Sequence, residues 1–186
     1  MKKIAFNLLL AASLFATAAC DNNKTNDSTE QAEEMNEDKL SNSVEDDAEF
    51  AVEAANGGMM GVKMGELAQM NGSSADVKEF GKLMVDDHGQ ANEELKSLAA
   101  QKNIMLPTTL GNDMQQKYDE MAKKTGKEFD KEYVDMMVKD HKKDIDAFKE
   151  EANEGKDADM KAFAAKTLPT LEMHMQRIQA IQGSMK

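Results

Sequence analysis

Apolar residues recur at steps of three and four along most of the chain between residues 48 and 182. Such spacing places apolar side chains on one face of an α-helix, and it predicts helices over 48–70, 73–102, 110–123, 127–153 and 157–182. No stretch shows the alternating β-branched and aromatic residues that are typical of a strand. We therefore expect an all-α fold, a four-helix bundle in which the short helix 110–123 forms part of a crossover.

Particular residues mark the expected helix ends. Ser73 or Ser74 is expected to cap the second helix, and Gly72 is expected to end the first helix in a left-handed conformation. Asn103 is able to take the same conformation at the end of the second helix. Pro169 lies inside the last helix, where it removes one backbone donor and is expected to bend the helix.

The 48–70 helix carries a strip of small residues on one side. Each interior glycine costs about 1 kcal/mol relative to alanine, so a strip of them predicts close approach of another backbone. Charged residues within the helix exclude a membrane-spanning segment, so we expect tight packing inside the domain. The strip consists of Ala54, Gly57, Gly58, Gly61, Gly65 and Ala68.

The residues before the bundle have a different composition. A basic start, an uncharged apolar stretch over 4–19 and the sequence Ala18-Ala19-Cys20 resemble the signal of a bacterial lipoprotein, which is cut before a cysteine that then carries lipid. An ordinary secretory signal with an incidental cysteine is the alternative. Residues 21–47 are almost entirely polar and are expected to form a disordered tether. We therefore predict a signal peptide over 1–19, lipidated Cys20 with its acidic tether over 20–47, and a helical domain over 48–182.

This arrangement implies a protein of the bacterial cell envelope that contacts the membrane through its N-terminal lipid, with the outer membrane preferred. Its domain is then expected in the periplasm or at the cell surface. The net charge of −12 argues against nucleic acid as a partner, because phosphate binding requires a basic surface. Cys20 is the only cysteine, so the fold has no disulfide and depends on its core.

The chain contains three histidines, and all three fall on apolar helix faces. His88 and His141 close two similar phrases, Leu83-Met84-Val85-Asp86-Asp87-His88 and Met136-Met137-Val138-Lys139-Asp140-His141. His174 closes a third, shorter phrase in the last helix. We expect the three imidazoles to converge inside the bundle.

Converging imidazoles suit a transition metal such as zinc, copper or iron. Met84 and Met137 each precede a histidine by one helical turn, and Asp144 follows His141 by about one turn, so these three side chains are further candidate ligands. Thioether together with imidazole would favour copper(I). The alternative is that the histidines are ordinary core residues hydrogen-bonded to Asp144, Glu172 or backbone carbonyls, with methionine as adaptable filling.

Two classes of enzyme are disfavoured by the motifs. A ferritin-type di-iron site needs Glu-x-x-His pairs, and the sequence contains none. No Ser/His/Asp or Cys/His pattern suggests a nucleophile, and we assign no catalytic residue. Two hypotheses remain: a non-catalytic metal-binding bundle for storage or buffering, and a structural or interaction bundle of the envelope without metal.

Several phrases together resemble a bacterial family called domain of unknown function 4142. They include Val77-Lys78-Glu79-Phe80-Gly81, Met84 to His88, Met137 to His141 and Thr167-Leu168-Pro169-Thr170-Leu171-Glu172-Met173-His174. The resemblance implies an all-α, ferritin-like bundle in an envelope lipoprotein, and it implies no activity. Where the family often has glutamate, this chain has Gly61 and Lys63, so neither position offers a carboxylate to a central site.

Overall fold

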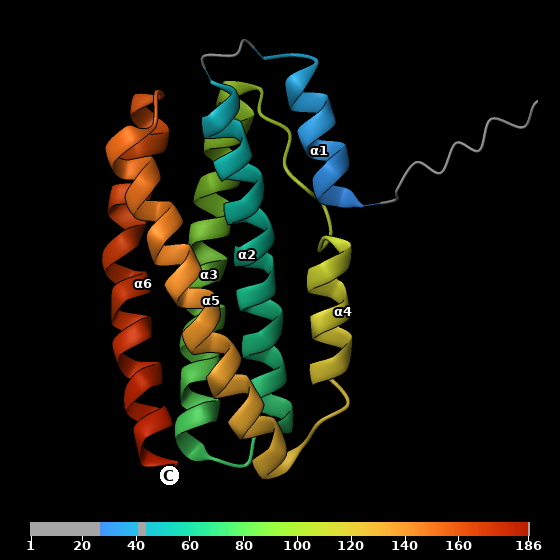
Figure 1. Cartoon of the computed structure of the whole chain (residues 1–186), viewed down its shortest axis with the longest axis vertical. Coiled ribbons are helices and arrows are strands. Elements are labelled where there is room, and N and C mark those ends of the chain that lie inside the picture. The colour runs from blue at the N-terminus through green and yellow to red at the C-terminus, as the bar shows by residue number, and fades with distance from the viewer. Residues whose placement is uncertain (1–26, 41–43, 186) are drawn as a thin grey trace, which may run out of the picture.

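The computed structural model describes residues 27–40 and 44–185, and within these ranges it contains six helices and no strand. Four long helices lie side by side in a bundle, and two short helices pack along one side of it (Figure 1). The long helices are α2 (Glu45–Asn71), α3 (Ala75–Lys102), α5 (Gly126–Glu154) and α6 (Ala158–Ser184), and the short ones are α1 (Ser28–Glu37) and α4 (Asn112–Met121). The predicted all-α bundle is confirmed.

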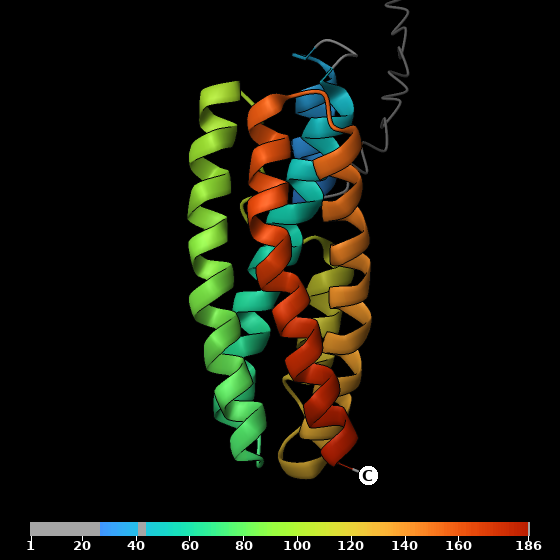
Figure 2. The same ribbon diagram turned by 90° about the vertical axis from the view of Figure 1, so that its left-hand side faces the viewer.

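The bundle is built from two antiparallel hairpins. α2 packs mainly on α3, α5 packs mainly on α6, and the hairpins meet through α2 with α5 and α3 with α6. Figure 2 shows α3 and α6 side by side on the face turned away from α4. Between the hairpins the chain returns from one end of the bundle to the other through residues 103–111 and α4, as the predicted crossover requires.

The helix ends match the prediction in part. Asn103 takes the left-handed conformation, with φ of 59°. Gly72 does not, because its φ is −63°, and the chain instead turns directly into the start of α3. Ser74 occupies the cap position of α3 without a side-chain cap bond. The carboxylate of Asp130 in α5 accepts the backbone N–H groups of Ser73 and Ser74, each at 2.9 Å, so the cap comes from another helix.

Helix α1 lies in the segment predicted to be disordered, and the prediction is wrong for these residues. Asp27 accepts the N–H of Thr29 at 2.9 Å and that of Asn112, at the start of α4, at 2.8 Å. Asn36 exchanges two hydrogen bonds with the backbone of Met105, at 2.9 and 2.7 Å. Composition indicated disorder because few apolar residues are available, whereas polar side chains hold this helix. The predicted signal peptide and Cys20 lie outside the described residues.

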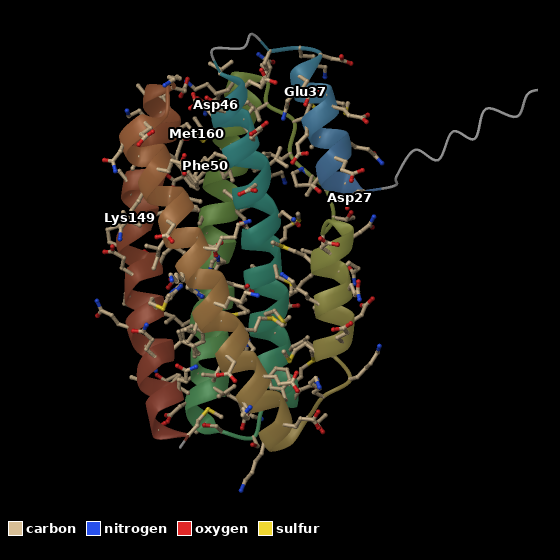
Figure 3. The ribbon with its side chains drawn as sticks, in the orientation of Figure 1. Asp27, Glu37, Asp46, Phe50, Lys149 and Met160 are labelled. Carbon is tan, nitrogen blue, oxygen red and sulfur yellow. The ribbon has the colours of Figure 1, made fainter. Side chains whose placement is uncertain are left out.

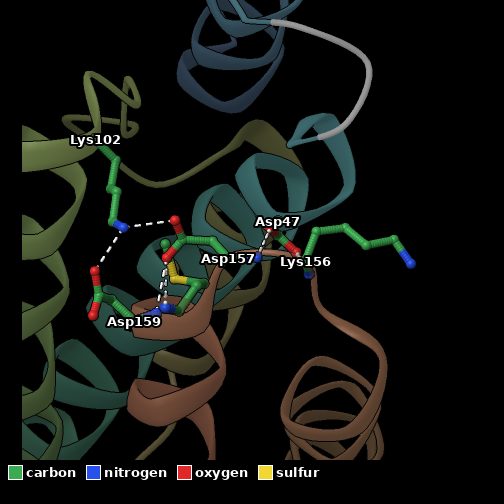
Figure 4. Close-up of polar contacts among 6 residues, drawn as sticks. Asp47, Lys102, Lys156, Asp157 and Asp159 are labelled. Carbon is green, nitrogen blue, oxygen red and sulfur yellow. Dashed lines mark hydrogen bonds and ion pairs between the residues drawn. The ribbon is translucent and has the colours of Figure 1, made fainter.

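Aspartates also join the helices at the end of the bundle where α2 begins. Asp47 is fully buried, and its two oxygens accept the N–H groups of Lys156 and Asp157 at 2.8 and 2.6 Å (Figure 4). Lys102 pairs with Asp157 and Asp159 at 2.6 and 2.7 Å, which adds the end of α3 to the same network. These contacts hold the ends of α2, α3 and α6 together.

The core is divided into two apolar clusters along the bundle axis. One cluster includes Phe80, Met84 and Met137, and the other includes Leu95, Phe148 and Leu171. Along α3, α5 and α6, the three histidines occupy the positions between these clusters. None of the described helices is both long enough and apolar enough to cross a membrane.

The small residues of α2 allow α3 to approach closely, as predicted. A Cβ added to Gly65 would lie 2.5 Å from the carbonyl oxygen of Gly81, and one added to Gly81 would lie 2.6 Å from Cβ of Ala68. No side chain fits at these positions without moving the backbone. The close contact holds α2 and α3 in one register next to the histidines.

Candidate metal centre

The three histidines converge in the middle of the bundle. His88 comes from α3, His141 from α5 and His174 from α6. Their ring centroids are 5.9 Å apart for His88 and His141 and 5.5 Å apart for each of the other two pairs. Their exposed fractions are 8%, 1% and 0% respectively, so the rings are shielded from water. The predicted convergence is confirmed.

Hydrogen bonds fix which nitrogen carries the proton in two of the rings. His141 Nδ1 lies 2.8 Å from the carbonyl oxygen of Met137, which only accepts, so Nδ1 is the donor and Nε2 keeps its lone pair. His174 Nε2 lies 2.8 Å from Oδ2 of Asp87, so in the neutral ring Nδ1 keeps its lone pair. This is the pattern of histidine ligands in metal sites, where the second nitrogen donates to a carboxylate or a backbone carbonyl.

One ring nitrogen of each histidine has no hydrogen-bond partner among the described residues. These nitrogens are Nε2 of His88, Nε2 of His141 and Nδ1 of His174, and all three are buried. A buried polar atom without a partner costs about 1–3 kcal/mol, and native proteins contain few of them. Three such atoms in one place are lone pairs that a single ion could accept together.

The distances suit a metal ion as that partner. One nitrogen from each histidine lies within 4.8 Å of one from each of the others. Zinc–nitrogen bonds of about 2.0–2.1 Å in a tetrahedron place ligand nitrogens about 3.4 Å apart. The spacing that a tetrahedral zinc site requires is thus no more than about 1.4 Å shorter than the spacing in the structure.

Burial keeps the histidines neutral. It lowers the pKa of His88 to about 3, with repulsion from His141 and His174 as lesser causes. Burial also lowers the pKa of His141 to about 4, against the opposing effect of the bond to Met137. The pKa of His174 is lowered by burial and raised in part by Asp87. At neutral pH all three rings are therefore uncharged, which is the form that binds metal.

Two neighbours position the rings. A Cβ added to Gly61 of α2 would lie 2.8 Å from Cγ of His88, so the ring of His88 occupies the space that a side chain at position 61 would need. Phe80 packs against His141 and His174, with ring centroids 6.1 and 6.0 Å apart. The sequence placed Gly61 in the strip of small residues and at a position without a carboxylate, but it gave neither Gly61 nor Phe80 a role in positioning the histidines.

Cavities lie on two sides of the cluster. One, the methionine-lined cavity, has a volume of about 150 Å³ and is lined by His88, His141, Met60, Met84, Met137 and Asp144 among others. The other, the α3–α6 cavity, has a volume of about 110 Å³ and is lined in part by Asp87, His88 and His174. A metal held by the histidines thus has room for a further ligand.

The other predicted site residues have different positions. Met84 and Met137 are buried and line the same cavity as His88 and His141, as expected for candidate ligands. Asp144 lines this cavity too, but it makes no hydrogen bond to a histidine. Burial, and then the charge of Asp140, raises the pKa of Asp144 to about 7.

The hydrogen-bond partners expected under the ordinary-core alternative are only partly found. Glu172 pairs with Lys149 at 3.1 Å on the surface instead of with a histidine. The carboxylate bonded to a histidine is that of Asp87, which immediately precedes His88 in the sequence. The sequence does show this carboxylate in α3. It does not show that the carboxylate bonds to His174, because His174 lies in another helix.

Three neutral imidazoles in this arrangement could hold one transition-metal ion. No curated protein and no solved structure matches this chain. The family described as "Domain of unknown function (DUF4142)" matches residues 29–181, which include α1 and nearly all of the bundle. The chain therefore belongs to the DUF4142 family.

Proposed function

We propose that this protein binds a transition-metal ion through His88, His141 and His174, as a non-catalytic module that stores or buffers the metal. The observation that carries the proposal is the set of three buried ring nitrogens without a partner. In two of these rings the other nitrogen already donates its N–H, to the carbonyl oxygen of Met137 in His141 and to the carboxylate of Asp87 in His174. The lone pair of the unpartnered nitrogen is therefore available to a metal.

Zinc, copper and iron all accept imidazole ligands, and the side chains around the histidines favour some of these metals over others. No carboxylate joins the three histidine nitrogens in the described part of the chain, which disfavours iron sites built from carboxylates. Met84 and Met137 line the adjoining cavity and favour copper(I), because thioether sulfur is a soft ligand. Zinc requires only the three imidazoles and one further ligand.

A purely structural role is the second candidate. The histidines form a polar layer between two apolar clusters, and buried polar groups of this kind can set the register of packed helices. Such a layer is stable when its polar atoms are satisfied. The unpartnered nitrogens favour the metal-binding function over this alternative.

The test is a series of thermal unfolding curves for the metal-free protein with zinc, copper(I), iron(II) or manganese added. A ligand that binds only the folded state raises Tm. At a free-metal concentration of about one hundred times Kd, it raises the free energy of unfolding by about 2.7 kcal/mol. We expect at least one metal to raise Tm of the wild type and not of His141→Ala. Leu95→Ala is the control, because it removes a buried side chain outside the site and should keep the shift.

If no metal raises Tm of the wild type, or if the shift persists in His141→Ala, the histidine layer is structural. His141→Ala alone is expected to lower stability by about 1–3 kcal/mol through a lost buried hydrogen bond, whether or not metal binds. The metal dependence of Tm is therefore the discriminating quantity.

For location, we propose a lipid anchor on Cys20 that holds the domain at a bacterial envelope membrane. The supporting pattern is the apolar stretch over 4–19 followed by small residues and the only cysteine. Cys20→Ser is expected to release the protein from membranes. Sedimentation of the variant with membranes after a carbonate wash would contradict lipid anchoring.

A further inference from the structure

An acidic groove of about 550 Å³ lies between α1, α2 and α5, at the end of the bundle where α2 begins. Its lining contains eight carboxylate side chains and a single lysine, Lys156. Figure 3 shows Asp46 and Phe50 of this lining on the half of α2 that lies beside α1. The residues that matter below are Glu33 of α1, Glu49 and Glu53 of α2, and Glu150 and Glu151 of α5.

The carboxylates of the groove are close enough to influence one another. The pKa of Glu33 is raised by burial first and then by the charges of Glu49 and Glu53 across the groove. Glu151 is only 5% exposed, and its Oε1 has no hydrogen-bond partner among the described residues. The groove thus combines a strong negative field with a buried oxygen that lacks a donor, which is an environment that attracts cations.

The groove adjoins the methionine-lined cavity beside the histidines. Phe50, Glu53 and Ala147 line both spaces. Further inward, Asp144 lines the cavity together with His88 and His141. Glu53 and Asp140 both act on Asp144 by raising its pKa, although burial is the larger cause. Carboxyl side chains therefore continue from the surface to the histidines, and Asp144, whose pKa is raised to about 7 by burial, is partly protonated at neutral pH.

The other approaches to the histidines are less favourable for a cation. On the side of α4 the cavity is lined by Lys117, whose positive charge opposes an incoming cation, whereas Lys143 of α5 pairs with Glu53 at 3.7 Å. On the opposite side, the α3–α6 cavity is lined by Glu94 and Lys166, which form an ion pair at 2.7 Å. Each of these two cavities is lined by one more carboxylate than lysines, whereas the acidic groove is lined by eight carboxylates and one lysine.

We propose that the acidic groove is the entrance through which a hydrated metal cation reaches the three histidines, with Glu53 and Asp144 as the carboxylates along the way. This inference rests on the proposed metal-binding function. It adds a second, weaker cation-binding surface that collects metal from solution. An acidic opening raises the local concentration of a cation and its association rate, and salt removes the effect.

The test is stopped-flow binding of cobalt(II) to the whole protein, followed by the visible absorption that develops when cobalt takes nitrogen ligands. The groove variant is Glu49→Gln/Glu53→Gln/Glu150→Gln, which neutralises three exposed side chains. The control is Glu79→Gln/Asp86→Asn/Glu93→Gln, which changes the net charge equally on the exposed surface of α3. Both variants keep the histidines, and circular dichroism checks their helix content.

At an ionic strength of about 0.01 M we expect cobalt to bind the groove variant at least about fivefold more slowly than the control. The difference should nearly disappear at about 1 M, where the Debye length is about 3 Å. Equal rates for the two variants at low salt would overturn the entrance and leave the histidine site standing.

Two further outcomes are also decisive. Faster loading of a Glu94→Gln/Lys166→Gln variant, with no effect of the groove substitutions, would place the entrance between α3 and α6 and overturn the proposal. If wild-type protein develops no cobalt absorption at all, the proposed function fails, and the entrance fails with it.

Discussion

Replacing Asp87 by asparagine tests whether this carboxylate orients a ligand. Asp87 Oδ2 accepts a hydrogen bond from Nε2 of His174 at 2.8 Å, and His174 is fully buried. The substitution keeps the shape of the side chain and removes its charge. Losing the partner of a ligating histidine typically weakens metal binding about 10–100-fold, which corresponds to about 1.4–2.7 kcal/mol. We therefore expect Kd of Asp87→Asn to rise by this factor.

The matched control is Asp86→Asn, one residue earlier in α3. Asp86 pairs with Lys82 on the surface, where its side chain is 57% exposed, so the substitution changes net charge equally without touching a histidine. Kd is measured for both variants by titration of the metal-free protein with cobalt(II), and with zinc in competition. If Asp87→Asn weakens binding no more than Asp86→Asn does, the reasoning that Asp87 orients His174 toward a metal is refuted.

Three further predictions concern Gly61 beside His88, the pH dependence of stability, and the contacts of Asp47 at the end of the bundle. Gly61→Ala is expected to weaken metal binding, because the added Cβ would lie 2.8 Å from Cγ of His88. The control is Gly89→Ala, where the added Cβ has open space and should stabilise the helix by about 0.5–1 kcal/mol. Equal metal Kd values for the two variants would contradict the role of Gly61. His141 has its pKa lowered to about 4, so its contribution to stability is complete above about pH 6.5 and is lost as the pH falls toward 4. Urea unfolding of metal-free wild type beside His141→Leu should show wild type losing roughly 2 kcal/mol more between pH 6.5 and 5, and a constant difference would contradict this. Asp47→Ala removes two hydrogen bonds to the N–H groups of Lys156 and Asp157 and should lower the free energy of unfolding by about 2–4 kcal/mol, whereas the exposed neighbour Asp46→Ala should change it little.

The four long helices could be predicted because each buries an apolar face along its length, and α4 could be predicted from a shorter apolar side, of which only Met121 is fully buried. The ends of these helices and the connections between them were less predictable, because they depend on contacts with residues far away in the sequence. Asp130 of α5 caps α3, so the conformation of Gly72 and Ser74 follows from a residue far away in the sequence. Helix α1 was missed for a similar reason, because Asn36 and Asp27 hold it through bonds to the crossover.

The histidines could be predicted to converge because each lies on the apolar face of a different long helix. Their hydrogen-bond partners could not. Asp144 was the natural candidate because it follows His141 by about one turn, but it lines the cavity without bonding to a histidine. The pairing of Asp87 with His174 depends on the rotation of α3 relative to α6, which the apolar pattern of either helix alone does not determine.

The most direct test of the metal centre is X-ray absorption spectroscopy of the protein loaded with one equivalent of zinc, and separately of copper(I). For zinc, three imidazole nitrogens at about 2.0–2.1 Å, together with the multiple-scattering signature of histidine, are predicted from His88, His141 and His174. The same measurement on His141→Ala should lose one imidazole. A first shell of oxygens alone, or a spectrum unchanged by the substitution, would show that the metal binds elsewhere and would contradict the histidine site.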